Sequence, residues 1–546
     1  MHLQNGESAA GQFKIDNSNN AVGQSGYKAY SNNLSYAERG LTNVLLSGEH
    51  HTKEEKWVLD WKLSPTFSNI DEPDLRRTAF TITPQGDSVF NAGAGGNPYR
   101  IWRFLNEVNV VGQVNLKRNF TLFEREAKLK FGASHVYKQR DFNILSFDLQ
   151  SFGAQPDYDG NPNNILTNDR LFPDGNLYYN SANGDPNPNQ YTSSIQNTGA
   201  YVSVEASPST LLKVVLGLRA ENFVQKHTGR DQQGATGAGG NVLDNDKVLE
   251  SLDLFPSANI IYAVKENQNL RFSYFRSIAR PSFKELSFAQ IVDPITNRTF
   301  NGGLFAIGDW DGNLSETRIN NIDLRYEVFM KPGEIISFSG FVKLFNDAIE
   351  LVRIPEAVTS PNFQPRNVGD GQVFGLEFEL RKNLGFTGPV LSKVSFSGNY
   401  TYAYSQIEMS DVEFDARKDF EKEGENVERT RAMAGQAPHI INAGLTYDDV
   451  MKKMNFGVFY NVKGRTLEVV GGGLYPDVYT EQFHSLNLTA SKSFGKDDRS
   501  TVSLRVSNIL NDDRESFYVG YEAQDQIFSR LSPGTEFSIS YTYNFR

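Results

Sequence analysis

Two acidic segments hold the residues of this chain that could bind a metal ion. Asp157, Asp159, Asn161 and Asn163 alternate around Gly160, and Asp309, Asp311 and Asn313 alternate around Gly312. Oxygen ligands at alternate positions are typical of calcium loops, which also need a bidentate glutamate further along the chain. Neither segment has a glutamate at that spacing. We therefore interpret both as solvated loops, with Ca²⁺ binding as the alternative, and we expect no other cofactor.

Catalytic chemistry has little support from the residue types present. The chain has no cysteine, and its seven histidines are scattered. The adjacent pair His50-His51 would point to opposite faces of a strand. We see no nucleophile–base arrangement and predict that the chain is not an enzyme. The net charge of −11 also argues against nucleic acid as a partner, since nucleic-acid binders usually present a basic face.

Aromatic residues within long polar segments are the better candidates for contacting a ligand. Such side chains could stack on a sugar ring or on an aromatic chelate. The alternative is that they brace loops against one another. The candidate residues are Phe305, Trp310, Tyr475, Tyr479, Tyr518 and Tyr521.

The elements that must position these segments are strands, because apolar and polar residues alternate along nearly the whole chain. About 17 or 18 strands satisfy this alternation test. No stretch approaches the roughly 18 consecutive apolar residues of a membrane-spanning helix. The alternation is clearest at the C-terminus, where the apolar set is Phe537, Ile539, Tyr541, Tyr543 and Phe545.

The strand lengths and connections predict the fold class. The alternating segments run to about 10 to 18 residues, which suits a tilted membrane crossing and exceeds the usual strand of a β-sandwich. Tight turns alternate with long polar connections. We therefore predict an all-β fold, a transmembrane antiparallel β-barrel of the outer-membrane type, with its tight turns on the periplasmic side. The barrel is expected over residues 34–546, after an irregular segment at 1–33 that has room for one remnant strand.

Charged residues in the alternate positions of these strands indicate a wet interior. In each strand the apolar set should meet lipid and the polar set should face the lumen. We interpret the charged set as a network of salt bridges, with direct contact to a substrate as the alternative. Its members are Asp323, Arg325, Glu327, Glu377, Glu379 and Arg381.

Several segments, taken in order, resemble the TonB-dependent receptor family, particularly its Bacteroidota-type members. Ser273 to Leu286 is similar to a family segment in which an aromatic strand leads into Arg-Pro and then Glu-Leu. Asn321 to Glu327 resembles the next strand, Gly340 to Phe345 and Gly375 to Leu380 resemble later ones, and Ser507 to Asn511 with the terminal strand resembles the last hairpin. The resemblance implies a barrel of 22 strands around an N-terminal plug that carries a box for the energising protein TonB. The chain has no plug-like segment and no leader at Met1, so we expect an N-terminally truncated form, with closure into a smaller barrel as the alternative.

The resemblance implies an outer-membrane receptor and transporter for TonB-dependent uptake of a large nutrient. A ferric siderophore, a cobalamin-like compound or an oligosaccharide would fit. A passive porin-like channel and a surface assembly or adhesion barrel are the alternatives. The expected location is the outer membrane of a Gram-negative bacterium, as a multi-pass β-barrel. Expected partners are outer-membrane lipid, lipopolysaccharide, the barrel-assembly machinery and the substrate, with TonB reached only through a plug.

Overall fold

The computed structural model describes residues 2–16, 28–82, 85–89, 98–153, 159, 161, 164–165, 167–181, 184, 186–293, 298–354, 362–473 and 475–545. Within these ranges no helix has the length and apolar character needed to span a membrane.

One large sheet dominates the described chain and contains 24 strands. Six of them are short pieces, and the other eighteen follow one another as the wall. The wall strands are β1 (His2–Asp16), β2 (Lys28–Asn43), β4 (Trp57–Ile82), β6 (Tyr99–Leu122), β7 (Arg125–Ser151), β9 (Tyr191–Ala206), β10 (Leu212–Arg230), β11 (Val242–Lys265), β12 (Gln268–Ala279), β15 (Thr317–Phe329), β16 (Ile335–Arg353), β17 (Asn362–Asn383), β18 (Val394–Glu408), β20 (His439–Asp449), β21 (Met454–Lys463), β24 (Phe483–Phe494), β25 (Ser500–Ser507) and β28 (Glu536–Tyr543).

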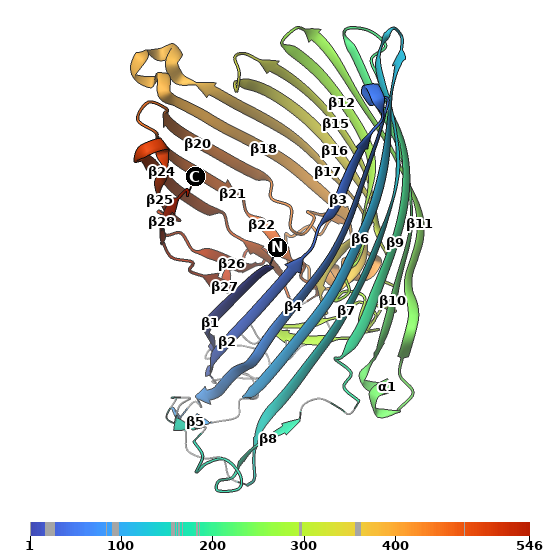
Figure 1. The fold of residues 1–546 in the computed structure, drawn as a ribbon. Helices are drawn as coiled ribbons and strands as arrows, with labels where there is room; N and C mark the ends of the chain where they lie inside the picture. The colour runs from blue at the N-terminus through green and yellow to red at the C-terminus, as the bar shows by residue number, and fades with distance from the viewer. Residues whose placement is uncertain are drawn as a thin grey trace.

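Neighbouring wall strands are antiparallel and pair in chain order from β1 to β28. Figure 1 shows the tight turns gathered at one end of this curved wall, and the longer connections with β5, β8 and α1 at the other. The all-β antiparallel barrel fold and the predicted number of strands are confirmed. Among the described residues, β1 pairs only with β2, and β28 pairs only with β25.

The short strands and helices lie in the connections. The short strands are β3 (Leu46–His51), β5 (Ser88–Val89), β8 (Leu177–Ser181), β13 (Gln290–Asp293), β14 (Arg298–Asn301), β19 (Thr430–Arg431), β22 (Thr466–Val469), β23 (Asp477–Thr480), β26 (Arg514–Val519) and β27 (Gln526–Leu531). The helices are α1 (Gln232–Thr236), α2 (Asp411–Lys418) and the 3-10 turns η1 (Lys53–Glu55), η3 (Leu384–Thr387), η4 (Pro389–Lys393) and η5 (Lys496–Asp498).

The two faces of the wall differ as the alternation predicts. Leu324 and Leu376 are each 50% exposed on the outer face, and their neighbours Arg325 and Glu377 point to the inner face. Where the backbone groups of neighbouring strands are hydrogen-bonded to each other, the outward side chains are the groups that meet lipid. In the terminal strand the apolar residues Phe537, Ile539, Tyr541, Tyr543 and Phe545 are exposed, and so are the polar residues that alternate with them, so exposure does not separate its two faces.

The sheet extends further than the alternation indicates, both upstream of residue 34 and along single strands. β1 and the first residues of β2 lie within residues 1–33, so strands already occur upstream of residue 34. β4 and β7 have 26 and 27 residues, well beyond the 9 to 11 that a tilted crossing needs. These strands therefore continue past the membrane-spanning band and support the long connections.

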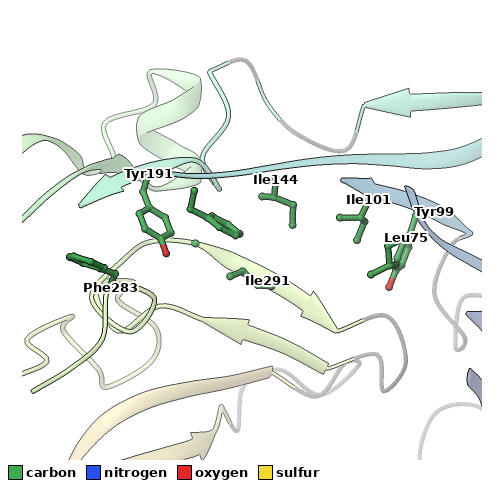
Figure 2. Packing of buried hydrophobic residues seen from close by; sticks show 9 residues of the cluster. Leu75, Tyr99, Ile101, Ile144, Tyr191, Phe283 and Ile291 are labelled. Carbon is green, nitrogen blue, oxygen red and sulfur yellow. The ribbon is translucent and has the colours of Figure 1, made fainter. Parts of the chain in front are cut away.

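A connection that folds inward creates the largest apolar cluster. Residues after β12 lie against the inner face of β4, β6, β7 and β9, as Figure 2 shows for Phe283 and Ile291 facing the wall side chains. Lys138 and Arg140 on β7 also lie over the Phe283 ring, at 5.6 and 5.2 Å from its centre. The cluster comprises Leu75, Tyr99, Ile101, Phe142, Ile144, Tyr191, Phe283, Ala289 and Ile291.

Candidate ligand-binding surface formed by the long loops

Two long loops build a separate four-stranded sheet in the order β22-β23-β26-β27. The pairing of Val478 on β23 with Tyr518 on β26 joins the loop before β24 to the loop before β28. Val470 then forms a parallel bridge with Val352, and the backbone N–H of Arg353 donates to the Val470 carbonyl at 3.3 Å. This loop sheet is thereby fixed to the loop end of β16.

Arg353 brings two of the candidate tyrosines together. Its guanidinium carbon lies 3.2 Å from the centre of the Tyr475 ring, and its side chain donates to the Tyr518 hydroxyl. Tyr518 packs edge-on against Phe528, with ring centres 5.0 Å apart. Arg298 lies over the other part of this group, 3.6 Å from the centre of the Phe528 ring. The result is an aromatic cluster that holds two guanidinium groups.

Tyr479 and Tyr521 lie in the same two loops but make different contacts. Arg465 lies over the Tyr479 ring at 5.1 Å. The Tyr521 hydroxyl donates to the Gly424 carbonyl at 3.0 Å, and Lys422 donates to the Tyr521 carbonyl at 2.7 Å. Tyr521 therefore joins its loop to the one that follows α2.

Burial changes the titration of the tyrosines inside the loop sheet. It raises the pKa of Tyr479 and that of Tyr518, because the phenolate is poorly solvated there. The neighbouring guanidinium groups oppose this rise without cancelling it. Both phenols are accordingly neutral at physiological pH.

A chain of ion pairs connects the loop sheet to α2 and β16. Arg417 on α2 pairs with Asp477 at 2.7 Å and with Glu413 at 3.1 Å. Glu413 also pairs with Arg431 at 2.6 Å, and Arg431 reaches Glu350 on β16 at 2.7 Å. Burial would lower the pKa of both arginines, but these carboxylates outweigh it and raise them. The alternating charges therefore compensate one another between α2, β16 and β23.

Phe305 and Trp310 form a second group in the connection after β14. Trp310 donates from its indole nitrogen to the Gly303 carbonyl at 2.7 Å, and Gln364 donates to the Phe305 carbonyl at 2.6 Å. Arg366 pairs with Asp309 at 2.9 Å and lies 5.7 Å from the Trp310 ring. These contacts brace the connection against β17.

The oxygen groups of the two acidic segments are engaged by neighbouring donors. Asp311 accepts from the backbone and side-chain nitrogens of Asn313, at 3.1 and 2.6 Å. Asp159 accepts from the Asn161 backbone at 2.9 Å and from Asn164 at 2.6 Å. Asp157, Gly160 and Asn163 lie outside the described residues. Over the ranges that the structure describes, no group of three or more histidine, cysteine, aspartate or glutamate side chains could hold a metal ion, and Ca²⁺ binding stays the untested alternative to a solvated loop.

The charged set of the inner face includes a compact ion-pair network. Arg325 pairs with Glu327 and with Glu379, each at 2.7 Å. Arg271 adds a pair with Glu327 at 2.6 Å, and Arg381 adds one with Glu379 at 2.9 Å. Asp323 and Glu377 share this face but form no ion pair within the described chain. The observed contacts are those of a wall network.

The sequence comparison decides the family. The model described as "TonB dependent receptor-like, beta-barrel" matches residues 3–509. The chain belongs to the TonB-dependent receptor family. Members of this family are receptors and transporters of the outer membrane and not enzymes. A comparison with curated proteins gives no match.

Solved TonB-dependent receptors share the fold of this chain at low sequence identity. The pyoverdine outer membrane receptor FpvA from Pseudomonas aeruginosa PAO1 gives a TM-score of 0.57 at 12% identity, over 100% of this chain and 72% of that one. BauA, the ferric preacinetobactin receptor of Acinetobacter baumannii, gives 0.52 at 12%, over 95% and 63%. The ferric-catecholate import receptor Fiu from E. coli K12 gives 0.52 at 11%, over 99% and 75%. The chain thus spans 63% of the length of BauA.

Three residues of the loop surface are not indicated by the sequence. Arg298, Arg353 and Phe528 complete the group around Tyr475 and Tyr518, yet they lie far apart in the chain and belong to no motif that links them. Non-local pairing brings Arg353 and Phe528 together, through the bridge of Val352 with Val470 and the pairing of β23, β26 and β27. The sequence gives one weak signal for Arg353. It directly follows the apolar residues Leu351 and Val352 at the end of a strand, which indicates a positive charge at the loop end of that strand.

Proposed function

We propose that this TonB-dependent receptor captures a large nutrient on its long-loop surface, as the membrane-spanning part of an uptake system in the outer membrane. A ferric siderophore is the first candidate, ahead of a cobalamin-like compound or an oligosaccharide. The observation that carries the proposal is the aromatic cluster of Tyr475, Tyr518 and Phe528 around two arginines. Flat aromatic surfaces with a few fixed polar groups suit the binding of a bulky, partly apolar ligand.

The fold neighbours support this order of candidates. The receptors named above are described as binding or importing pyoverdine, ferric preacinetobactin and ferric catecholates. Their identity with this chain is low, so they support the choice of a ligand class for testing. Energising through TonB, contact with outer-membrane lipid and lipopolysaccharide, and insertion by the barrel-assembly machinery are further parts of the proposal.

Ligand binding to the purified chain in detergent micelles tests the proposal. The probes are a ferric catecholate, a ferric hydroxamate, vitamin B12 and a maltooligosaccharide, followed by quenching of intrinsic fluorescence. We expect Y475A and Y518A to weaken binding at least tenfold, and Y404A, on the outer face, to leave it unchanged. Equal binding by all variants would refute the location.

Conductance in planar bilayers separates uptake from passive diffusion. In a receptor of the proposed kind, any stable open current should be altered in the ligand-binding variants Y475A and Y518A. A steady, ligand-independent conductance together with no saturable binding of any probe would favour a porin-like channel instead.

A further inference from the structure

Arg353 differs from the other buried arginines of the loops in its charge partners. Arg366, Arg417 and Arg431 each form an ion pair with a carboxylate, at 2.9, 2.7 and 2.7 Å. Arg353 is only 8% exposed and forms no ion pair with any carboxylate of the described chain. Its Nε hydrogen is buried without an acceptor among the residues that the structure describes. Arg514 also has no ion pair within the described ranges, but it is exposed and therefore solvated.

The neighbours of Arg353 do not supply a negative charge. The ring of Tyr475 covers one face of the guanidinium, and the Tyr518 hydroxyl accepts one hydrogen bond from it. Both groups are aromatic alcohols, which attract a cation but leave its net charge uncompensated. An isolated buried cation is unfavourable unless a counter-charge reaches it. Among the described residues, the arrangement around Arg353 therefore lacks one negative group.

The guanidinium group of Arg298 adds a second positive charge to the same aromatic cluster. Arg298 lies on Phe528, and Phe528 packs on Tyr518, so the two guanidinium groups flank one phenol. Arg298 itself has a carboxylate at 3.6 Å, on Glu468. Thr480 also donates to Glu468, at 2.8 Å. Glu468 is therefore shared with other donors and compensates Arg298 more than Arg353.

We propose that Arg353 binds an oxyanion of the ligand, a carboxylate or a phosphate, within the aromatic cluster of Tyr475 and Tyr518. The inference rests on the proposed function, since it assigns the chemical class of a group that the captured nutrient carries. A guanidinium presents its N–H groups in a planar fork that matches both oxyanions, and it can stack on an aromatic ring at the same time. The ligand should therefore combine an acidic group with a flat or apolar body that packs on the tyrosines.

Glu350 and Glu356 are the acidic residues nearest to Arg353 in the sequence; Glu350 pairs with Arg431 at 2.7 Å, and Glu356 lies outside the described residues. Glu356 is therefore the residue of the chain whose charge the experiment has to test as an alternative partner. The two sources predict opposite responses to neutralising Glu356. Loss of Glu356 has no effect if an external oxyanion is the partner, and strengthens oxyanion binding if Glu356 normally occupies the guanidinium.

Calorimetric titration of the purified chain in detergent micelles with inorganic phosphate and, separately, with succinate tests the inference. We expect saturable binding of at least one of them, which distinguishes a phosphate from a carboxylate ligand. R353Q should weaken it at least tenfold, and R353K should weaken it less because the charge remains. E356Q and the exposed control R514Q should match the unsubstituted chain.

Three results would overturn the inference. They are equal affinity of R353Q and the unsubstituted chain, no saturable binding of either anion, and tighter binding by E356Q. Thermal unfolding of each variant checks that the barrel is intact, and R353K provides a readout if R353Q does not fold. If tyrosine-dependent binding of a siderophore persists while oxyanion binding fails, the proposed function stands and this inference falls.

Discussion

Arg325 on β15 and Glu379 on β17 are joined across the strand between them, with Nη2 of Arg325 donating to Oε2 of Glu379 at 2.7 Å. The same arginine donates to Glu327 on its own strand. One guanidinium therefore links strands that share no backbone hydrogen bonds. Charge pairs of this kind add side-chain links to the wall on its inner face.

Removing Arg325 should destabilise the barrel more than removing Arg381. R325M leaves the buried Glu327 with Arg271 as its remaining partner, and we expect the free energy of unfolding to fall by about 3 kcal/mol. R381M removes a side chain that is 62% exposed, so a loss under about 1 kcal/mol is expected. Unfolding of each variant by guanidinium chloride in micelles measures both losses. Equal losses would show that the network does not stabilise the wall.

Phe283 should be a principal anchor of the connection that follows β12. It is 2% exposed, and F283A should lower the free energy of unfolding by about 3 kcal/mol through loss of buried apolar area and the cavity left behind. F386A, at a phenylalanine that is 71% exposed, is the matched control, and we expect a change within about 0.5 kcal/mol. Faster amide exchange over residues 283–291 in F283A alone would locate the effect. Unchanged exchange there would contradict the anchoring role.

A glycine on β17 makes room for an aromatic ring on the inner face. A Cβ added at Gly375 would overlap the ring of Phe341, which is its cross-strand partner. We expect G375A to lower the free energy of unfolding by about 2 kcal/mol. At Gly340, the nearest atom to an added Cβ is 3.6 Å away, so G340A is the control and should change little. The F341A/G375A double variant should recover part of the loss, and strictly additive losses would argue against the overlap.

Alkaline pH should loosen the loop sheet. Burial raises the pKa of Tyr479 and Tyr518 in the folded state, so folding favours their neutral phenols. The stability from this source is complete below the unfolded pKa of about 10 and is lost as pH rises through the higher folded values. An absorbance titration should show late-ionising phenols, one fewer in Y479F and one fewer in Y518F. An unchanged late phase in both variants would mean that these two phenols are solvated.

The wall could be predicted from the sequence wherever only one of its faces is apolar. Asp323, Arg325 and Glu327 alternate with exposed apolar residues, and their strand lies where the pattern indicates. The pattern is weaker in β6, because Ile101 on its inner face is apolar as well. Its apolar neighbours there come from the connection after β12, which no local pattern reveals. β4 adds a register shift between Glu72 and Leu75, with Asp74 at φ 56°, that exchanges the two faces.

Only part of the candidate ligand-binding surface could be predicted from the sequence. Tyr475 and Tyr518 are recognisable as aromatic residues in polar segments, and the structure places both on Arg353. Trp310 and Phe305 are recognisable on the same grounds, but they brace a different connection. The distinction depends on which loops pair with each other. Such pairing is non-local, so residue type and spacing do not determine it.

The contact between Phe283 and the far wall also has a mechanical consequence. The wall from β4 to β12 is curved (Figure 1), and the connection after β12 contacts the inner face of β4, β6 and β7 and so joins the two ends of this curved part. A contact of this kind limits how far the strands that it joins can move apart, and so fixes the curvature of the wall between them. We therefore expect the end of the wall that carries the long loops to resist widening. Fluctuations in the curvature of the wall should be larger at the opposite end, where tight turns join the strands.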